Sequence, residues 1–231
     1  MANTKIKNEA LRSSILEAAS NLFIEKGLAG TKIQDIAGAL GITRTNVYYY
    51  YKNKEDILEK LTLDVTNLAK EVTTAAIGAK DQDPPAMLRS LVIMYSSFVL
   101  KQPILFRVSE RNEQNLKAKD RSKVTRARRS VLDNFRAVIE RGVVSGHFRG
   151  IDPGVTAFSI IGICNWSAWW FRPGGKYKAQ EVAEQIADLV AHAVEQPDRQ
   201  LRARNNGREI VKRIRGELEY LENLIPERPG R

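Results

Sequence analysis

Apolar residues recur every three or four positions along most of the chain, which is the period of an α-helix with one buried face. In the N-terminal part this period begins at Leu11 and is interrupted at Gly27, a residue type that often ends helices in the left-handed conformation. It is interrupted again at Gly41, which suits a tight turn, and resumes over residues 44–51. The pattern therefore predicts three consecutive helices before residue 54.

Capping residues define the boundaries of the second and third helices. Thr31 and Gln34 have the spacing of a capping box, in which each side chain bonds the backbone amide of the other residue. They predict the start of a short helix that ends at Leu40. Thr43 can accept a hydrogen bond from an amide in the first turn of the third helix, which is predicted to be about two turns long.

A longer amphipathic helix is predicted next. Asn53 is its expected N-cap, and its apolar positions continue to about Ala79, far enough to connect the first three helices with a larger body. Beyond it, proline, glycine and polar breaks separate five more predicted helices, over 85–100, 103–115, 119–144, 153–171 and 180–195. No alternating strand pattern competes with them. The predicted fold class is all-α.

The last two of these helices are predicted to form a hairpin. The turn contains Pro173, Gly174 and Gly175. The face that we expect to pack on the preceding helix consists of Val182, Ile186, Val190 and Ala193. Two such hairpins, related by a twofold axis, would form the four-helix bundle of a homodimer.

The segment after Pro197 carries a narrower apolar seam with alternating spacings of three and four. It consists of Val211, Ile214, Leu218, Leu221 and Ile225. The seam predicts an extra C-terminal amphipathic helix. This helix is too short to stand alone, so it is expected to dock either on its own body or on the other subunit of the dimer.

The formal charge of the chain is +10, and it is unevenly distributed. Residues 117–129 contain seven basic residues against Asp120 alone, and residues 199–215 contain seven against Glu209 alone. The combined net charge of these two runs is larger than the net charge of the whole chain. A basic surplus favours a polyanionic partner, although each run has a solvated helix face as its alternative explanation.

The chain has little chemistry for catalysis or metal binding. His147 and His192 are its two histidines, Cys164 is its single cysteine, and no nucleophile, metal-ligand or glycine-rich phosphate motif occurs. We therefore predict no enzyme activity, no cofactor and no metal. The absence of a signal sequence and of any possible internal disulfide predicts a cytoplasmic protein. The apolar run 155–171 contains polar interruptions and is shorter than the ~20 residues of a membrane span, so no membrane contact is predicted.

Several motifs of the first sixty residues resemble the head of TetR-type transcriptional regulators. They are Thr31-x-x-Gln34, Gly41, Thr43 and the segment Arg44-Thr-Asn-Val-Tyr-Tyr-Tyr-Tyr-Lys-Asn-Lys54. The resemblance implies a helix-turn-helix DNA-binding domain over 1–54, a helical ligand-binding and dimerisation domain over 55–196, and a C-terminal extension over 197–231. It also implies a dimeric repressor that binds a palindromic double-stranded DNA operator and is released by a small-molecule effector.

The N-terminal end of the short third helix is the predicted reader of DNA bases. Helix-turn-helix proteins insert such an end into the major groove, where Arg suits guanine, Asn suits adenine and the Thr methyl suits thymine. The four consecutive tyrosines could belong to the core of the head, but they cannot all face one way. The resemblance implies that Tyr51 packs inward while Tyr48 and Tyr49 reach the DNA. By resemblance, the predicted set is Thr31, Gln34, Thr43, Arg44, Thr45, Asn46, Tyr48, Tyr49, Tyr50 and Lys54, with Arg44, Thr45 and Asn46 as base readers.

The predicted helix over 153–171 ends in a large aromatic surface followed by a cation. Trp166, Trp169 and Trp170 either fill the dimer interface, or Trp166, Trp170 and Arg172 line a ligand portal. The Trp-Phe-Arg-Pro-Gly-Gly hairpin resembles that of family members that respond to acyl-CoA thioesters. Because such a ligand carries several phosphates, the predicted ligand-binding set also includes Arg126, Arg128 and Arg129 of the basic run.

A DNA-binding protein without an effector is the alternative function. It would be a constitutive repressor, or an architectural protein that uses its basic tail. Salt distinguishes these classes, because a specific repressor keeps its preference for one palindrome as the salt concentration rises, whereas a packaging protein loses binding to all sequences together.

Overall fold

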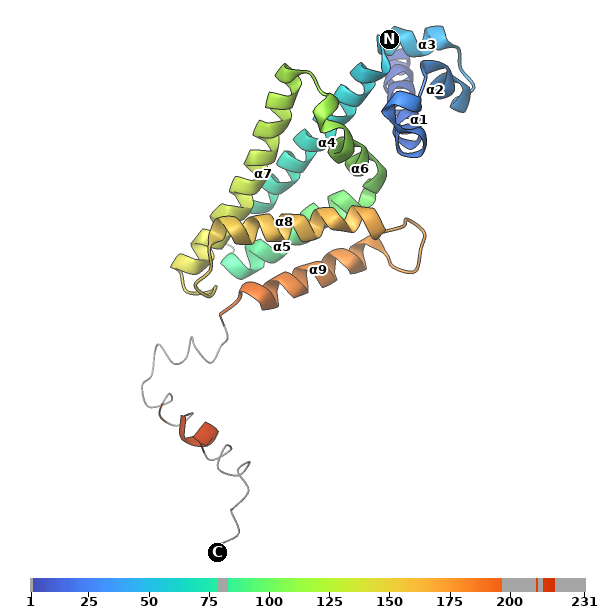
Figure 1. Cartoon of the computed structure of the whole chain (residues 1–231). Helices are drawn as coiled ribbons and strands as arrows, with labels where there is room; N and C mark the ends of the chain where they lie inside the picture. Colours follow the sequence, from blue (N-terminus) through green and yellow to red (C-terminus); the bar gives the residue numbers. More distant parts are fainter. Residues whose placement is uncertain (1, 79–82, 197–210, 212–213, 219–231) are drawn as a thin grey trace, which may run out of the picture.

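A computed structural model describes residues 2–78, 83–196, 211 and 214–218 of the chain. Every regular element within these residues is helical, as the sequence predicts, and the one β-type contact is an isolated bridge between Phe148 and Glu195. Figure 1 shows a small head of α1 (Ala2–Gly30), α2 (Ile33–Ala39) and α3 (Arg44–Tyr50) at one end of the molecule. The long helix α4 (Lys54–Ile77) runs from this head into the body.

The head contains the breaks that its glycines predict. Gly27 has φ of 72° and interrupts α1, and Gly41 has φ of 63° in the turn between α2 and α3. Both values lie in the left-handed region that glycine adopts without a steric cost. Asn53 caps α4 as expected, since its side-chain oxygen accepts a hydrogen bond from the Asp56 amide at 2.7 Å.

The capping box predicted for Thr31 and Gln34 is wrong. Helix α2 begins after Lys32, whose backbone amide donates to the Asp35 carboxylate at 3.0 Å. The Thr31 hydroxyl instead donates to the carbonyls of Gly27 and Leu22, at 2.8 and 3.2 Å. The kink at Gly27 leaves carbonyls of α1 without helical partners, and a buried hydroxyl satisfies them.

The body is built from the remaining helices around one apolar cluster. They are α5 (Pro84–Lys101), α6 (Pro103–Asn112) with the short 3-10 helix η1 (Glu113–Asn115), α7 (Ala118–Val144), α8 (Pro153–Trp170) and α9 (Ala179–Val194). Asp83 and Asp152 cap α5 and α8, and each of these helices has proline in its first turn. The predicted boundaries agree with the observed ones to within a few residues.

A second apolar cluster lies in the head and extends beyond it. Helix α4 contributes to both clusters, with Ile57, Leu58 and Leu61 in the head cluster and Val65 and Ala69 in the body cluster. Three residues from later in the chain are also buried in the head cluster. They are Val108 of α6, Leu116 between η1 and α7, and Val124 of α7. The segment from α6 to the start of α7 is therefore packed against the head as well as the body. We call residues 108–124 the α6–α7 corner.

The predicted packing of the last hairpin needs correction. Helix α9 packs chiefly against α5 and only lightly against α8. Its buried face includes Val182, Ile186 and Val190 as expected, but continues to Val194, while Ala193 is exposed. Helix α5 has buried apolar residues on more than one side, so it packs against both α8 and α9. Because α9 lies on α5, it leaves an outer apolar face of α8 exposed.

Little of the predicted C-terminal helix belongs to the described part of the chain. Val211, Ile214 and Leu218 lie in short helical stretches and are exposed, whereas Leu221 and Ile225 lie outside the described residues. Within the described residues, no single helix is long and apolar enough to span a membrane. The bent pair Pro84–Lys101 and Pro103–Asn115 meets that criterion only when the two are taken together.

The end of α7 provides a test of body packing. Gly142 is buried beneath the ring of Phe148, and a Cβ at position 142 would overlap that ring. We expect Gly142→Ala to lower the free energy of unfolding by about 1–3 kcal/mol, because a fully buried ring must move. Gly38→Ala is the control, since a Cβ at Gly38 meets no atom within 4 Å. It should not destabilise the protein. Urea unfolding of both variants measures the difference, and equal stabilities would contradict this account.

Candidate nucleic-acid interface and ligand cavity

The N-terminal end of α3 is presented to solvent on a firmly packed base. Thr43, Arg44, Thr45 and Asn46 are exposed, whereas Val47 is fully buried in the head cluster. The Thr43 hydroxyl accepts a hydrogen bond from the Asn46 backbone amide at 3.3 Å and donates one to the Asn46 side-chain oxygen. The cap therefore orients Asn46 at the front of the helix, beside the partial positive charge of the helix N-terminus.

The four tyrosines divide between surface and core as expected. Tyr48 and Tyr49 are 53% and 76% exposed, and the Tyr50 hydroxyl donates to the Asn8 side-chain oxygen at 3.1 Å. Tyr51 is buried, and its hydroxyl accepts a hydrogen bond from the Arg12 guanidinium at 3.3 Å. Burial raises the pKa of Tyr51 above its usual value, so the side chain stays neutral. Tyr51 anchors α3 to α1, while Tyr48 and Tyr49 remain free for a partner.

Three other residues of the predicted DNA-binding set occupy different environments. Gln34 is exposed on α2. Thr31 is fully buried, so its hydroxyl stabilises the fold and does not reach a ligand. The Lys54 ammonium donates to the carbonyls of Leu28, Ala29 and Thr31 at 2.7, 3.1 and 3.1 Å. Lys54 thus binds the end of α1, and its three N–H groups are all used within the head.

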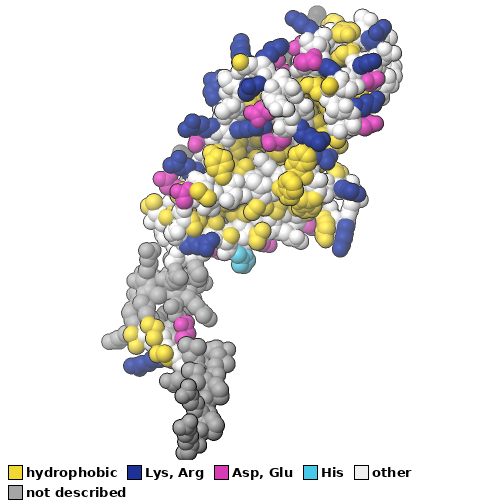
Figure 2. Space-filling view, viewed as in Figure 1, with side chains coloured by type: hydrophobic (Ala, Val, Ile, Leu, Met, Phe, Trp, Pro, Cys, Tyr) yellow, Lys and Arg dark blue, Asp and Glu magenta, His cyan; other side chains and the backbone are white. Residues whose placement is uncertain are grey.

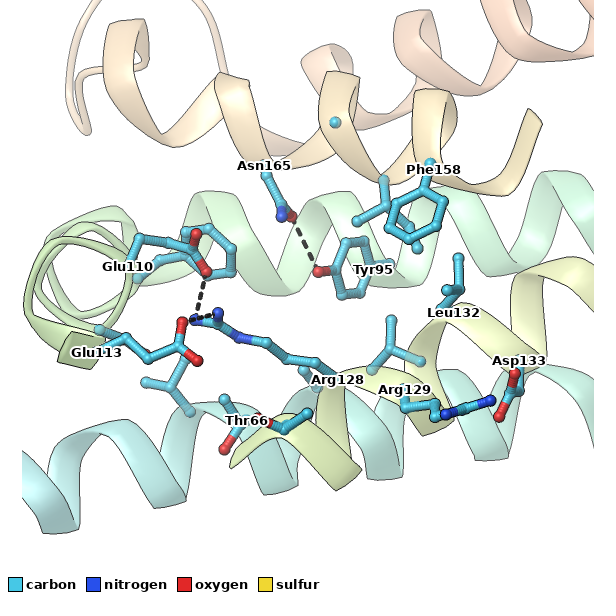
Figure 3. Close-up of a pocket in the computed structure, with 18 of the residues that line it drawn as sticks. Thr66, Tyr95, Glu110, Glu113, Arg128, Arg129, Leu132, Asp133, Phe158 and Asn165 are labelled. Atoms are coloured by element: carbon cyan, nitrogen blue, oxygen red, sulfur yellow. Dashed lines mark hydrogen bonds and ion pairs between the residues drawn. The ribbon is translucent and has the colours of Figure 1, made fainter. Parts of the chain in front are cut away.

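A cavity of about 710 Å³ lies in the body between α4, α5, α6, α7 and α8. Its size is in the range of small-molecule sites. Much of its wall is apolar, formed by Val65, Ala69, Phe106, Val131, Leu132, Phe158 and Ile161. Polar and charged side chains occur at separate places on this wall, and Figure 3 shows how they are arranged.

Three of the six charged side chains on the cavity wall are joined in ion pairs. The Arg128 guanidinium of α7 binds the Glu110 carboxylate of α6 at 2.7 Å and also the Glu113 carboxylate of η1 (Figure 3). Burial is the main cause that raises the pKa of Glu110, and Arg128 opposes it. On the same wall, Arg129 lies beside Asp133 in Figure 3, and Arg136 is exposed. Arg129 and Arg136 are therefore more available to an anionic ligand than Arg128.

The cavity includes only part of the predicted ligand-binding set. Arg128 and Arg129 line it, whereas Arg126 is exposed on α7 outside the lining. Trp166, Trp170 and Arg172 also lie outside the lining, and the two tryptophans are 65% and 48% exposed. None of these three residues lines the cavity, so the portal stays a prediction. The reason is helical phase, because Phe158, Ile161 and Asn165 form the face of α8 that is turned to the cavity.

Sequence reasoning missed the residues on α5 and α6 that line the cavity. Tyr95, Ser109 and Glu110 belong to segments that were interpreted only as core or connecting helices. The sequence did contain a sign that Tyr95 of α5 and Asn165 of α8 have partners, because both interrupt apolar runs and a buried polar group needs a hydrogen-bond partner. Only the fold, however, brings the two helices together.

The α6–α7 corner joins this cavity to the head. Glu110 and Glu113 face the cavity, while Val108 and Leu116 of the same segment are buried in the head cluster. Next to them, the Lys117 ammonium binds Asp56 and Glu59 in the first turns of α4, at 3.3 and 3.5 Å. A displacement of the corner therefore affects both the head core and the start of α4.

The role of Lys54 is testable through stability. Replacement Lys54→Met removes three charge-assisted hydrogen bonds to the end of α1, so we expect the free energy of unfolding to fall by about 1–3 kcal/mol. Lys52→Met is the matched control, because Lys52 is exposed in the same turn. It should leave stability unchanged within about 0.5 kcal/mol. Thermal and urea unfolding give the comparison. A Lys54→Met protein as stable as the control would show that these bonds contribute nothing.

Comparisons with known proteins agree with this geometry. Residues 15–61 match the family described as bacterial regulatory proteins, tetR family, and residues 81–194 match the tetracyclin repressor-like C-terminal domain. The chain is 31% identical to the TetR-family regulator PfmR of Thermus thermophilus. That structure aligns with a TM-score of 0.71 over 77% of this chain and 97% of its own.

Two further relatives show the same relationship. The HTH-type transcriptional repressor KstR2 of Rhodococcus jostii is 26% identical over 80% of this chain and 92% of its own. AibR, solved in complex with isovaleryl coenzyme A and operator DNA, is 24% identical and shares the fold. Its TM-score is 0.66 over 80% of this chain and 97% of its own. The chain thus belongs to the TetR family of transcriptional regulators.

Proposed function

We propose that this regulator is a repressor that binds a palindromic operator as a homodimer and leaves it when a small-molecule effector enters the cavity. The observation that carries the proposal is the α6–α7 corner, which lines the cavity with Glu110 and Glu113 and is buried in the head with Val108 and Leu116. A protein without an effector has no need of a large internal cavity next to the contact between head and body.

The exposed end of α3 supports the DNA part of the proposal. Arg44, Thr45 and Asn46 are free to meet base edges, and Tyr48 and Tyr49 are exposed beside them for the phosphate backbone. Gln34 and Thr43 complete the polar surface around them. Lys54 is bonded to α1, so it acts by holding the head together beneath this surface.

An uncovered apolar surface on α8 and α9 supports the homodimer. Figure 2 shows apolar side chains gathered over the body. The exposed ones on the two helices are Val155, Phe158, Ile163, Trp166, Trp169, Trp170 and Leu189. Large exposed apolar patches mark interaction sites, and a twofold axis would pair the α8–α9 surface with its copy. This favours the interface role for Trp166 and Trp170 over the portal role.

We propose an acyl-CoA thioester as the effector. The apolar wall suits an acyl group, and Arg129 and Arg136 are placed to bind phosphate oxygens. AibR provides a precedent within the same fold, since it was solved with isovaleryl coenzyme A. Arg128 supports the proposal less, because Glu110 and Glu113 already neutralise its charge.

Release of DNA follows from the geometry of a dimer. Two heads must lie about 34 Å apart to enter successive major grooves. An effector that binds better when the α6–α7 corner is displaced would shift α4 and change this separation. The effector would bind the state that cannot bind DNA more tightly than the state that can. The ratio of these two affinities sets how far the equilibrium shifts.

The DNA interface is tested first with Arg44→Ala. We expect affinity for the operator, located by footprinting upstream of the protein's own gene, to fall about 5- to 150-fold, because a base contact is lost. Binding to random DNA should change much less. Arg149→Ala is the control, since Arg149 is exposed in the connection between α7 and α8. Fluorescence anisotropy at fixed salt measures both DNAs, and an equal loss on random DNA would make Arg44 a phosphate contact.

The effector is tested by DNA release with isovaleryl-, octanoyl- and phenylacetyl-CoA. One of these thioesters is expected to release the operator. The double variant Arg129→Gln, Arg136→Gln should then need an about tenfold higher concentration of that thioester to release half of the DNA. Arg126→Gln, on the same helix but outside the cavity lining, should behave like the unmodified protein. If no thioester releases DNA or raises the melting temperature, the acyl-CoA assignment is wrong and the DNA-binding proposal remains.

A further inference from the structure

A hydrogen-bonded pair of polar side chains, one buried and one half-buried, lies on the wall of the cavity. Tyr95 of α5 is 4% exposed, and its hydroxyl donates to the side-chain oxygen of Asn165 on α8 at 2.9 Å. Figure 3 shows the two groups pointing toward each other across the cavity, with Phe158 on one side of Tyr95 and Glu110 on the other. Burying a phenol and an amide is unfavourable unless their hydrogen-bonding groups are satisfied.

One hydrogen bond does not satisfy this pair. With the Tyr95 hydroxyl as donor, the two amide hydrogens of Asn165 and a lone pair of the Tyr95 oxygen remain available. If the amide is turned over, Asn165 donates to Tyr95, and the phenolic hydrogen and the amide oxygen remain instead. In both orientations the pair keeps at least one unused donor and one unused acceptor. Burial raises the pKa of Tyr95 far above its usual value, so the hydroxyl keeps its proton.

A third polar side chain on the cavity wall is also unsatisfied. Ser109 of α6 is 2% exposed, and its hydroxyl has no hydrogen-bond partner among the described residues. It lines the same cavity as Tyr95 and Asn165, so three helices contribute neutral polar groups to one space. Packing alone does not require these groups, because the surrounding wall is formed by side chains such as Phe106 and Val131.

The ligand group that fits here is uncharged. The neighbouring ion-pair group has two carboxylates, Glu110 and Glu113, against the one guanidinium of Arg128, so it offers no unpaired positive charge. Glu110 lines the same cavity as Tyr95, and Figure 3 shows its carboxylate on the side of Tyr95 opposite Phe158. An anionic ligand group at the pair would meet this carboxylate, whereas a carbonyl or hydroxyl oxygen would not be repelled.

We propose that the cavity contains a subsite for an uncharged oxygen, a carbonyl or a hydroxyl, on the apolar part of the effector, bound by Tyr95 and Asn165. The proposal rests on the proposed function in taking this cavity as the effector site, and it deepens that function by naming an effector class. The effector class is an acyl-CoA thioester whose acyl group carries such an oxygen, and a plain hydrocarbon acyl group would fill the cavity without using this subsite. Ser109 is a further partner for the same oxygen.

The test uses two fragments that differ by one hydroxyl, 4-fluorophenol and fluorobenzene, titrated into the full-length protein and followed by fluorine NMR. Tyr95→Phe should lower the affinity for 4-fluorophenol about tenfold and leave that for fluorobenzene within about twofold, because one hydrogen bond is lost without a change of shape. Asn165→Leu should show the same selective loss. Tyr177→Phe is the matched control, since Tyr177 is exposed in the loop before α9 and lies outside the cavity.

Selective loss for the phenol in both variants supports the subsite. Failure of the unmodified protein to bind 4-fluorophenol, or an equal change for both fragments in a Tyr95→Phe protein that unfolds at the normal temperature, overturns it. The readout needs neither DNA nor coenzyme A. A failure of acyl-CoA to release the operator therefore counts against the proposed effector, and a failure of fragment selectivity counts against the subsite.

Discussion

Burial of the α6–α7 corner in the head core is the constraint on which the rest of this structure depends. Val108, Leu116 and Val124 come from the body in sequence but are covered by side chains of the head. Removing such residues from an apolar core costs roughly 1.5–3 kcal/mol each. The head therefore moves with the corner. The ion pairs of Lys117 with Asp56 and Glu59 add a weaker, exposed connection to α4.

The same corner carries the charges that face the cavity. Because Glu110 and Glu113 bind Arg128, the basic run over 117–129 contributes less free positive charge to the cavity than its composition suggests. In the function proposed above, anion affinity would depend on Arg129 and Arg136, and discrimination among effectors would depend on the apolar wall and the Tyr95–Asn165 pair. Removing one member of the ion-pair group would leave a partly buried carboxylate or guanidinium without a partner, which is why this group holds α6 and α7 together.

The head and the body of the chain correspond to the two domains of the TetR family. The family and its relatives are transcriptional regulators and not enzymes, and family models match both the head and the body of this chain. The body is all-helical within the described residues. The exposed tryptophans of α8 lie outside the cavity lining, whereas Phe158 belongs both to the lining and to the exposed apolar surface, so the two proposed sites adjoin on this helix.

The sequence by itself determined the helices, their order and the position of the exposed N-terminal end of α3, the proposed DNA-reading end. Those features depend on local causes such as apolar period, glycine conformation and the capping side chains of Thr43, Asn53 and Asp152, which act within a few residues. Only the tertiary structure decided that Thr31 and Lys54 hold the end of α1, that α9 packs on α5, and that Tyr95 meets Asn165 across the cavity. The contacts of Lys54, α9 and Tyr95 join segments far apart in the chain. For Thr31, the sequence offered Gln34 as an equally suitable local partner. Helical period shows which face of a helix is buried, but it does not show what covers that face.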